Sequence, residues 1–225
     1  MLKLQFVTVP KFVKRMFPKR IWALPSKDTV YLTFDDGPIP EITPWVLDIL
    51  KQYGAKATFF CIGDNIEKHP EIFKRIISEG HKTGNHTYHH LNGWKTTTEA
   101  YIDTVERCEE VMISNKYEVV SEVVQNKKIT EIIEKNFRPP YGKISSRQAK
   151  ILHKKNFRII MWSLLSYDYD ASVSEEKCLQ NVLNHIQPGS IVVFHDSLKA
   201  SRNLRHTLPK VLDYISEKEW QCSTV

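Results

Sequence analysis

Short runs of β-branched and aromatic residues alternate along the chain with longer segments of helical periodicity. We expect strands at residues 29–34, 56–62, 82–86, 136–138, 157–162 and 190–194. Helices are expected at residues 41–53, 66–79, 98–114, 145–155, 174–186 and 204–217. Strands and helices that alternate within one domain predict an α/β fold with a parallel sheet, either open or closed into a barrel.

The length of 225 residues predicts a single domain. No apolar run approaches the roughly 18 residues of a membrane span. The first residues have neither the apolar core nor the cleavage site of a secretory signal, so we expect a cytoplasmic protein. The four cysteines lie far apart and form no C-x-x-C, which favours free thiols in a reducing compartment.

The positive charge is concentrated at the N-terminus. Residues 1–27 contain seven of the 32 lysines and arginines and none of the 26 acids. This segment is expected either to pack across the barrel with its lysines solvated or to make peripheral contact with an anionic membrane surface. The rest of the chain has no basic excess, so we expect no nucleic-acid partner.

Two carboxylates, Asp35 and Asp36, directly follow the first expected strand at a Gly-Pro turn. His86 ends the third expected strand, and His90 lies one helical turn further along the sequence. Carboxylates and imidazoles together indicate a divalent-metal site, and a remaining carboxylate could act as a base in metal-assisted hydrolysis. The spacing alone leaves His81 and His89 as alternatives, and His86 and His89 could also share a helical face.

Other polar residues also follow expected strands. Arg138 and Tyr141 come after 136–138, Asp168 after 157–162, and His195 directly after 190–194. The carboxyl ends of the strands are where (β/α) barrels and open α/β sheets carry their active sites. We therefore expect these side chains to gather with Asp35 and Asp36 at one end of the sheet.

The motifs resemble those of the NodB-homology polysaccharide deacetylases, carbohydrate esterase family 4. The shared motifs are T-F-D-D-G-P (33–38), H-T-Y-H-H (86–90), R-P-P-Y (138–141) and F-H-D (194–196). The resemblance covers most of the chain and divides it into a lead-in at 1–27 and a deacetylase domain at 28–225. It implies a distorted (β/α) barrel with one divalent metal ion, usually zinc, with cobalt, nickel or manganese as alternatives.

The resemblance also implies roles for the matched residues. Asp36, His86 and His90 would bind the metal ion, and Asp35 would be the general base. Arg138 would hold Asp35 through a bidentate contact that keeps it ionised.

His195 would be the general acid that protonates the departing amine, and Asp168 would raise its pKa and orient its ring. The backbone N–H of Tyr141 would help to bind the oxyanion. Asp196 is expected only to cap the turn that follows its strand. Leu165, Tyr169 and Val193 depart from residues common in the family, which bears on substrate preference more than on activity.

The resemblance predicts removal of N-acetyl groups from an amino sugar in chitin-like oligosaccharide or peptidoglycan. O-acetyl esterase or small-molecule amidase activity is the alternative, and a non-catalytic carbohydrate-binding relic would lack a base, ligand or acid. Five aromatic residues could stack on sugars or pack in the core: Tyr88, Trp94, Trp162, Tyr167 and Tyr169. Residues 115–135 could form an inserted strand, hairpin or flap, and the oligomeric state stays open.

Overall fold

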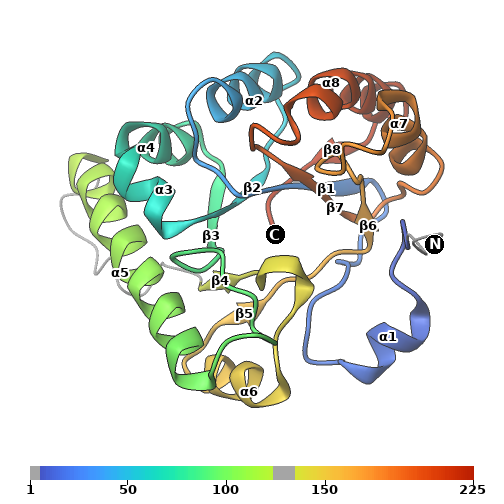
Figure 1. The fold of residues 1–225 in the computed structure, drawn as a ribbon. Coiled ribbons are helices and arrows are strands. Elements are labelled where there is room, and N and C mark those ends of the chain that lie inside the picture. Colours follow the sequence, from blue (N-terminus) through green and yellow to red (C-terminus); the bar gives the residue numbers. More distant parts are fainter. Residues whose placement is uncertain (1–5, 124–134) are drawn as a thin grey trace.

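The computed structural model describes residues 6–123 and 135–225, and a curled parallel sheet lies at its centre (Figure 1). In spatial order the strands are β5 (Arg158–Ile159), β4 (Asn136–Phe137), β3 (Lys82–Asn85), β2 (Thr58–Cys61), β1 (Thr29–Asp35), β7 (Ile191–His195) and β6 (Leu164–Leu165). A short strand, β8 (Gln221–Cys222), pairs with the beginning of β1. The predicted distorted (β/α) barrel is therefore confirmed, with β5 and β6 at its two edges.

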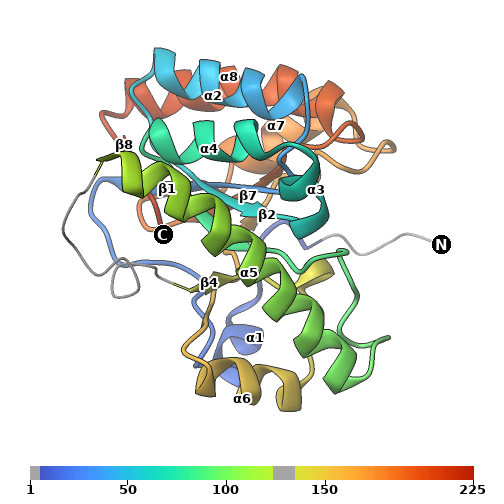
Figure 2. The same cartoon turned by 90° about the vertical axis from the view of Figure 1, so that its left-hand side faces the viewer.

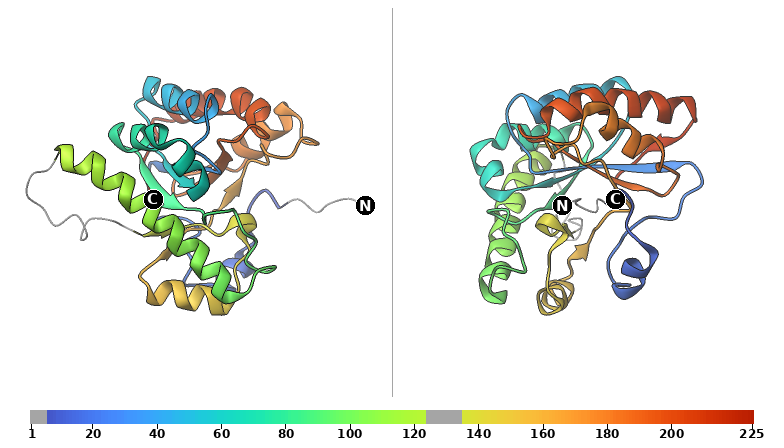
Figure 3. Two further views of the ribbon diagram at one scale, coloured as in Figure 1. Left: turned by 60° about the vertical axis from the view of Figure 1, so that its left-hand side comes forward. Right: turned by 45° about the vertical axis from the view of Figure 1, so that its right-hand side comes forward.

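Helices cover the outer side of this sheet. They are α1 (Lys11–Met16), α2 (Ile42–Gln52), α3 (Gly63–Lys68), α4 (Pro70–Ser78), α5 (Thr98–Val123), α6 (Ser146–Lys154), α7 (Glu175–Leu183) and α8 (Ser201–Glu217). Figure 2 shows α2, α4, α7 and α8 on one side of the strands and α1 with α6 on the opposite side. The long helix α5 crosses the flank of the barrel between these two groups (Figure 3).

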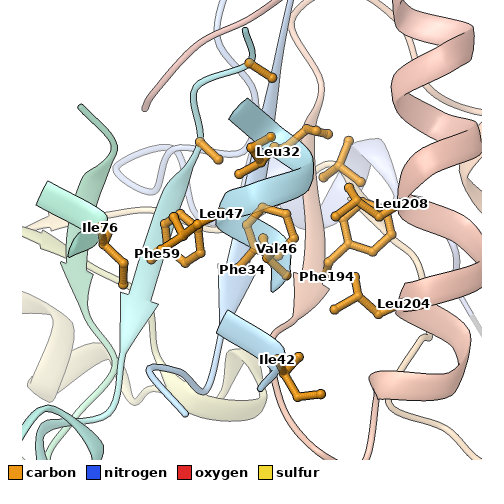
Figure 4. Packing of buried hydrophobic residues seen from close by; sticks show 14 of the residues in the cluster. Leu32, Phe34, Ile42, Val46, Leu47, Phe59, Ile76, Phe194, Leu204 and Leu208 are labelled. Atoms are coloured by element: carbon orange, nitrogen blue, oxygen red, sulfur yellow. The ribbon is translucent and has the colours of Figure 1, made fainter. Parts of the chain in front are cut away.

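Three phenylalanine rings form the centre of the main hydrophobic core (Figure 4). Phe34 on β1 lies 5.1 Å from Phe59 on β2 and 5.9 Å from Phe194 on β7, measured between ring centroids. Side chains from α2 and α8 cover these rings, among them Val46, Leu47, Leu204 and Leu208. This packing fixes β7, β1 and β2 relative to one another, so the residues at their carboxyl ends start from a rigid frame.

The basic lead-in segment lies between the two edge strands. Val7 and Val9 form backbone hydrogen bonds with the chain at β6, and Ile21 forms them with the chain at β5. Bridges at Thr8 and Ile21 extend the pairing of strands across the gap. Residues 7–23 therefore supply the contacts that β5 and β6 do not make with each other.

Several expected elements differ from those in the structure. The expected helix at 66–79 is two helices, because Pro70 begins α4 and His69 lies between α3 and α4. Helix α5 continues to Val123, so a strand, hairpin or flap is wrong for 115–123, and residues 124–134 lie outside the described residues. Within residues 6–123 and 135–225, the structure contains no helix with both the length and the apolar run of a membrane span.

Replacing Trp22 by alanine tests the contribution of the lead-in to the fold. Trp22 is 9% exposed, packs in a core cluster with Phe137 and Phe157, and donates a hydrogen bond from Nε1 to the Phe17 carbonyl. We expect Trp22→Ala to lower the free energy of unfolding by about 3–5 kcal/mol in urea denaturation. The control is Phe12→Ala, because Phe12 is 64% exposed and should cost little. Equal small losses in both variants would contradict a structural role for the lead-in.

Candidate active site

All the predicted site residues lie at or after the carboxyl ends of strands. Asp35 ends β1, His86 follows β3, Arg138 follows β4, and His195 ends β7. Asp168 follows β6, a two-residue strand that the sequence analysis missed, and not the strand at 157–162 as expected. A cavity of about 550 Å³ opens at this end of the barrel, and its lining includes Asp35, Asp36, His86, His90, Tyr141 and His195. Arg138 and Asp168 are buried behind the lining.

Asp36, His86 and His90 bring three potential ligand atoms together, all within 4.8 Å of one another. Asp36 Oδ1 lies 3.3 Å from His90 Nε2 and 3.9 Å from His86 Nε2. Asp36 Oδ1 is also buried without a hydrogen-bond partner. A buried, unpartnered carboxylate oxygen beside two imidazole nitrogens fits a bound divalent cation, which would supply the missing interaction.

Both histidines are held as neutral imidazoles. His86 Nδ1 lies 2.7 Å from the Arg138 carbonyl oxygen, so Nδ1 carries the proton and Nε2 faces Asp36 with its lone pair. Burial lowers the pKa of His86, and burial together with the neighbouring His86 lowers the pKa of His90 to about 4. Neutral imidazole is the form that binds metal ions.

The histidines do not lie on a helix, so the helical-face alternative is wrong. Residues 86–90 form a loop in which Thr87 and His90 adopt positive φ angles of 64° and 55°. Asn85, at the end of β3, holds this loop: its Oδ1 accepts from the Thr87 N–H, and its Nδ2 donates to the Val105 carbonyl. The loop points His90 toward Asp36, whereas His89 is exposed.

Four non-glycine residues of this site adopt positive φ angles. Asp36 has a φ of 87° and Tyr141 a φ of 60°, in addition to the values in the histidine loop. Non-glycine residues rarely adopt this region because Cβ crowds the backbone, and such residues often mark functional sites. The ring of Tyr141 is 4.6 Å from that of His90, and the Tyr141 side chain is 60% exposed at the cavity mouth.

Asp35 is held by a fully buried arginine. Arg138 Nη1 donates to Asp35 Oδ1 at 2.7 Å and to Thr33 Oγ1 at 2.7 Å. Nε and Nη2 donate to the carbonyls of Ile160 and Met161. The contact with Asp35 is thus through one nitrogen, not bidentate as expected, because the rest of the guanidinium is bonded to the barrel wall.

His195 is held by Asp168 through both carboxylate oxygens. Its Nδ1 lies 2.8 Å from Asp168 Oδ1, and its backbone N–H donates to Asp168 Oδ2 at 2.7 Å. Burial alone would lower the pKa of His195, but the Asp168 charge and hydrogen bond, with Asp36 and Asp35, raise it to about 9. The raised pKa favours the imidazolium form of His195, and the bond from Nδ1 to Asp168 leaves Nε2 directed away from Asp168.

Asp196 has a different partner from the one expected. Its carboxylate does not cap the turn after its own strand but accepts hydrogen bonds from the Gly37 N–H and from Thr43 Oγ1. Asp196 is fully buried, and burial raises its pKa to about 8. It ties down the turn that directly follows Asp36, a contact across 159 residues of sequence that no local pattern could indicate.

The aromatic candidates include cavity, surface and core residues. Trp162 and Tyr169 line the cavity, and Tyr169 lies 4.8 Å from the His195 ring. Trp94 is 68% exposed, whereas Tyr88 is buried beneath Arg107. Leu165 and Val193, two of the departures from the family pattern, also line the cavity, as does Tyr169.

Comparison with known proteins gives consistent matches. The profile of the polysaccharide deacetylase family matches residues 24–160. The chain is 40% identical over 172 residues to a peptidoglycan-N-acetylglucosamine deacetylase of Bacillus cereus, covering 76% of this chain but only 57% of that protein. It is 31% identical to a chitooligosaccharide deacetylase of Azorhizobium caulinodans, covering 76% and 75% of the two chains.

Among solved structures, the chain superposes on the Bc1960 peptidoglycan N-acetylglucosamine deacetylase with a TM-score of 0.82. The two share 34% sequence identity, and the match covers 96% of this chain and 95% of the other. That structure contains 4-naphthalen-1-yl-N-oxidanyl-benzamide. The fold thus occurs in a protein of very similar extent.

Replacing Gly37 by alanine tests whether the turn after β1 positions Asp36. A Cβ at Gly37 would lie 2.0 Å from Asp196 Oδ2, so the turn and the carboxylate could not both keep their places. We expect Gly37→Ala to weaken the binding of zinc about tenfold or more in calorimetric titration. Gly54→Ala is the control: its Cβ meets nothing within 4 Å, and its φ of +59° should cost stability without changing metal affinity. Unchanged zinc affinity in Gly37→Ala would contradict the positioning role.

Proposed function

The chain belongs to the polysaccharide deacetylase family, and we propose that it is a metal-dependent hydrolase that removes N-acetyl groups from amino sugars in chitin-like or peptidoglycan oligosaccharides. The proposal depends on the set of side chains that face one cavity. A carboxylate paired with arginine, an imidazole paired with aspartate, and a three-ligand cluster face the same space. These are the groups that hydrolysis of an amide requires.

Asp36, His86 and His90 are the proposed ligands of one divalent ion. A bound ion would lower the pKa of a water molecule and polarise the acetyl carbonyl. Two imidazoles and one carboxylate suit zinc, and leave positions for water and substrate, as catalytic zinc sites do. Cobalt, nickel and manganese are the alternatives.

Asp35 is the proposed general base. As the oxygen of water bonds to the acetyl carbon, the Asp35 carboxylate accepts the proton that the water loses. The hydrogen bond from Arg138 fixes the orientation of this carboxylate and leaves its second oxygen free to accept. The backbone N–H of Tyr141 is the proposed donor to the oxyanion that forms at the carbonyl oxygen.

His195 is the proposed general acid. When the bond between carbon and nitrogen breaks, its proton passes to the nitrogen, and the products are acetate and the amino sugar. Asp168 orients the ring and favours the protonated form. This protonated imidazole supports N-acetyl over O-acetyl substrates, because an amine leaves poorly without a proton while an alcohol depends on it less.

The residues around the cavity discriminate between the proposed function and its alternatives, O-acetyl esterase and small-molecule amidase activity. Tyr141 is exposed in the cavity lining, and the exposed Trp94 lies beside Lys143 of that lining. These rings favour an oligosaccharide over a small amide, because they offer stacking surface outside the reaction centre. A non-catalytic relic is disfavoured, since the base, the acid and all three ligands are present.

Acetate release tests the proposal directly. The zinc-loaded protein should release acetate from N-acetylglucosamine oligomers or peptidoglycan fragments, and a chelator should abolish the release. O-acetylated xylan and small N-acyl amides represent the alternatives. Acetate from these substrates alone would replace the proposed function with esterase or amidase activity.

Two aspartate variants separate ligand from base. Asp36→Ala should abolish zinc binding in calorimetric titration, because it removes a ligand. Asp35→Asn should still bind zinc but lose activity by about 10²-fold or more, since the amide cannot accept the proton. The control is Asp103→Asn, an exposed residue on α5. An active Asp35→Asn protein would refute the assignment of the base.

The pH profile tests the acid. Activity should fall on the alkaline side as His195 loses its proton, and the raised pKa delays that loss. Asp168→Asn removes the charge that raises this pKa, so the alkaline limb of kcat/KM should move to lower pH by about one unit or more. If the alkaline limb of Asp168→Asn stayed at the wild-type pH, a group other than His195 would be responsible for that limb.

A further inference from the structure

Two lysines line the cavity on separate walls. Lys143 follows the short helix after β4, and Lys199 lies in the loop after β7. The acids of the lining are Asp35 and Asp36, and these already face Arg138 and the histidine cluster. The lysines are therefore additional positive charges at the mouth, not partners of the catalytic carboxylates.

Each lysine ammonium is held by an aromatic ring instead of an acid. Lys143 Nζ lies 5.5 Å from the centroid of Trp94, and Lys199 Nζ lies 5.7 Å from that of Tyr169. Among the side chains that the structure describes, neither lysine forms an ion pair with a carboxylate. A ring attracts a cation and limits its positions but does not neutralise it.

The rings relate the two lysines to the reaction centre. Tyr169 packs against the proposed acid, with ring centroids 4.8 Å apart, so Lys199 lies on the side of the departing nitrogen. Tyr141, two residues before Lys143 in the cavity lining, packs against His90, a proposed metal ligand. A substrate bound in this cavity would meet a positive charge from each of two separate segments of its lining.

The chemistry of the lysines selects an anionic ligand. A sugar with only hydroxyl and acetamide groups offers an ammonium no opposite charge, and covering the ammonium would cost free energy. A carboxylate or a phosphate would compensate it, and lysine binds either group as a point charge. The exposed ring of Trp94 offers a stacking surface for a sugar beside Lys143.

We propose that Lys143 and Lys199 make this site selective for acetylated amino sugars that carry a carboxylate or phosphate close to the acetamide that is cleaved. This inference rests on the proposed function and adds a substrate class to it. The deacetylation itself is unchanged, and the lysines act on binding, not on the bond that breaks.

The experiment compares charged and neutral substrates on the zinc-loaded enzyme. The probes are a neutral N-acetylglucosamine tetramer, a glycan fragment in which N-acetylglucosamine alternates with its lactyl-ether carboxylate derivative, and N-acetylglucosamine 1-phosphate. The variants are Lys143→Gln, Lys199→Gln and the double variant. Lys51→Gln, an exposed lysine on α2 outside the cavity, is the matched control.

We expect the wild-type enzyme to prefer one anionic substrate, and the double variant to lower the charged-to-neutral ratio of kcat/KM about tenfold, mainly through KM. Added salt should lower the same ratio in the wild type, because it screens partly exposed charges. The anionic substrate whose kcat/KM falls in the double variant shows whether the lysines select a carboxylate or a phosphate. An equal kcat/KM for charged and neutral substrates, or an equal loss in Lys51→Gln, would overturn the inference.

Direct binding separates this inference from the proposed function. Asp35→Asn protein can be titrated with each charged sugar, with and without the lysine substitutions. Weaker binding in the double variant supports the inference even if no acetate is released from any substrate. Turnover of the neutral tetramer without charge preference would leave the proposed function standing and refute the lysine sites.

Discussion

The buried guanidinium of Arg138 is the constraint on which the interior of the barrel depends. A charge with no exposure to solvent is tolerated only when its donors are satisfied and an opposite charge is near. Thr33 and Asp35 on β1 and the carbonyls of Ile160 and Met161 meet these needs. Arg138 therefore joins β1 to the chain between β5 and β6, and the orientation of the proposed base is part of what holds the barrel together.

The lead-in segment also stabilises the barrel, because it pairs with both edge strands of the sheet. The edge strands β5 and β6 have two residues each, and the bonds at Val7, Val9 and Ile21 give them neighbours. The lead-in is also linked to a cavity residue: Tyr167 Oη donates to the Phe6 carbonyl, and the Tyr167 ring lies 5.9 Å from that of Tyr169, which lines the cavity. A basic segment that differs from the rest of the chain in composition thus contacts a residue that packs beside the cavity lining.

The position of the site was predictable, and its local geometry was not. Parallel strands carry their carboxyl ends to one edge, so residues that follow strands had to meet there. The loop at 86–90 depends on left-handed residues at Thr87 and His90, for which the sequence has no glycine signal. His90 was selected over His89 by resemblance to a family, not by spacing. Asp196 was misread because its partner, Gly37, is distant in sequence.

The proposed roles of Asp35 as base and His195 as acid depend on which strand supplies the partner of each residue. Asp35 and His195 are register partners on β1 and β7, so the two groups start side by side. β4 then brings a cation to the aspartate, whereas the chain after β6 brings an anion to the histidine. Opposite partners on adjacent groups favour a carboxylate that accepts a proton next to an imidazolium that donates one. Exchanging the partners would leave a carboxylate beside a carboxylate and a cation beside an imidazole. The proposed chemistry therefore depends on this strand order as much as on the residues themselves.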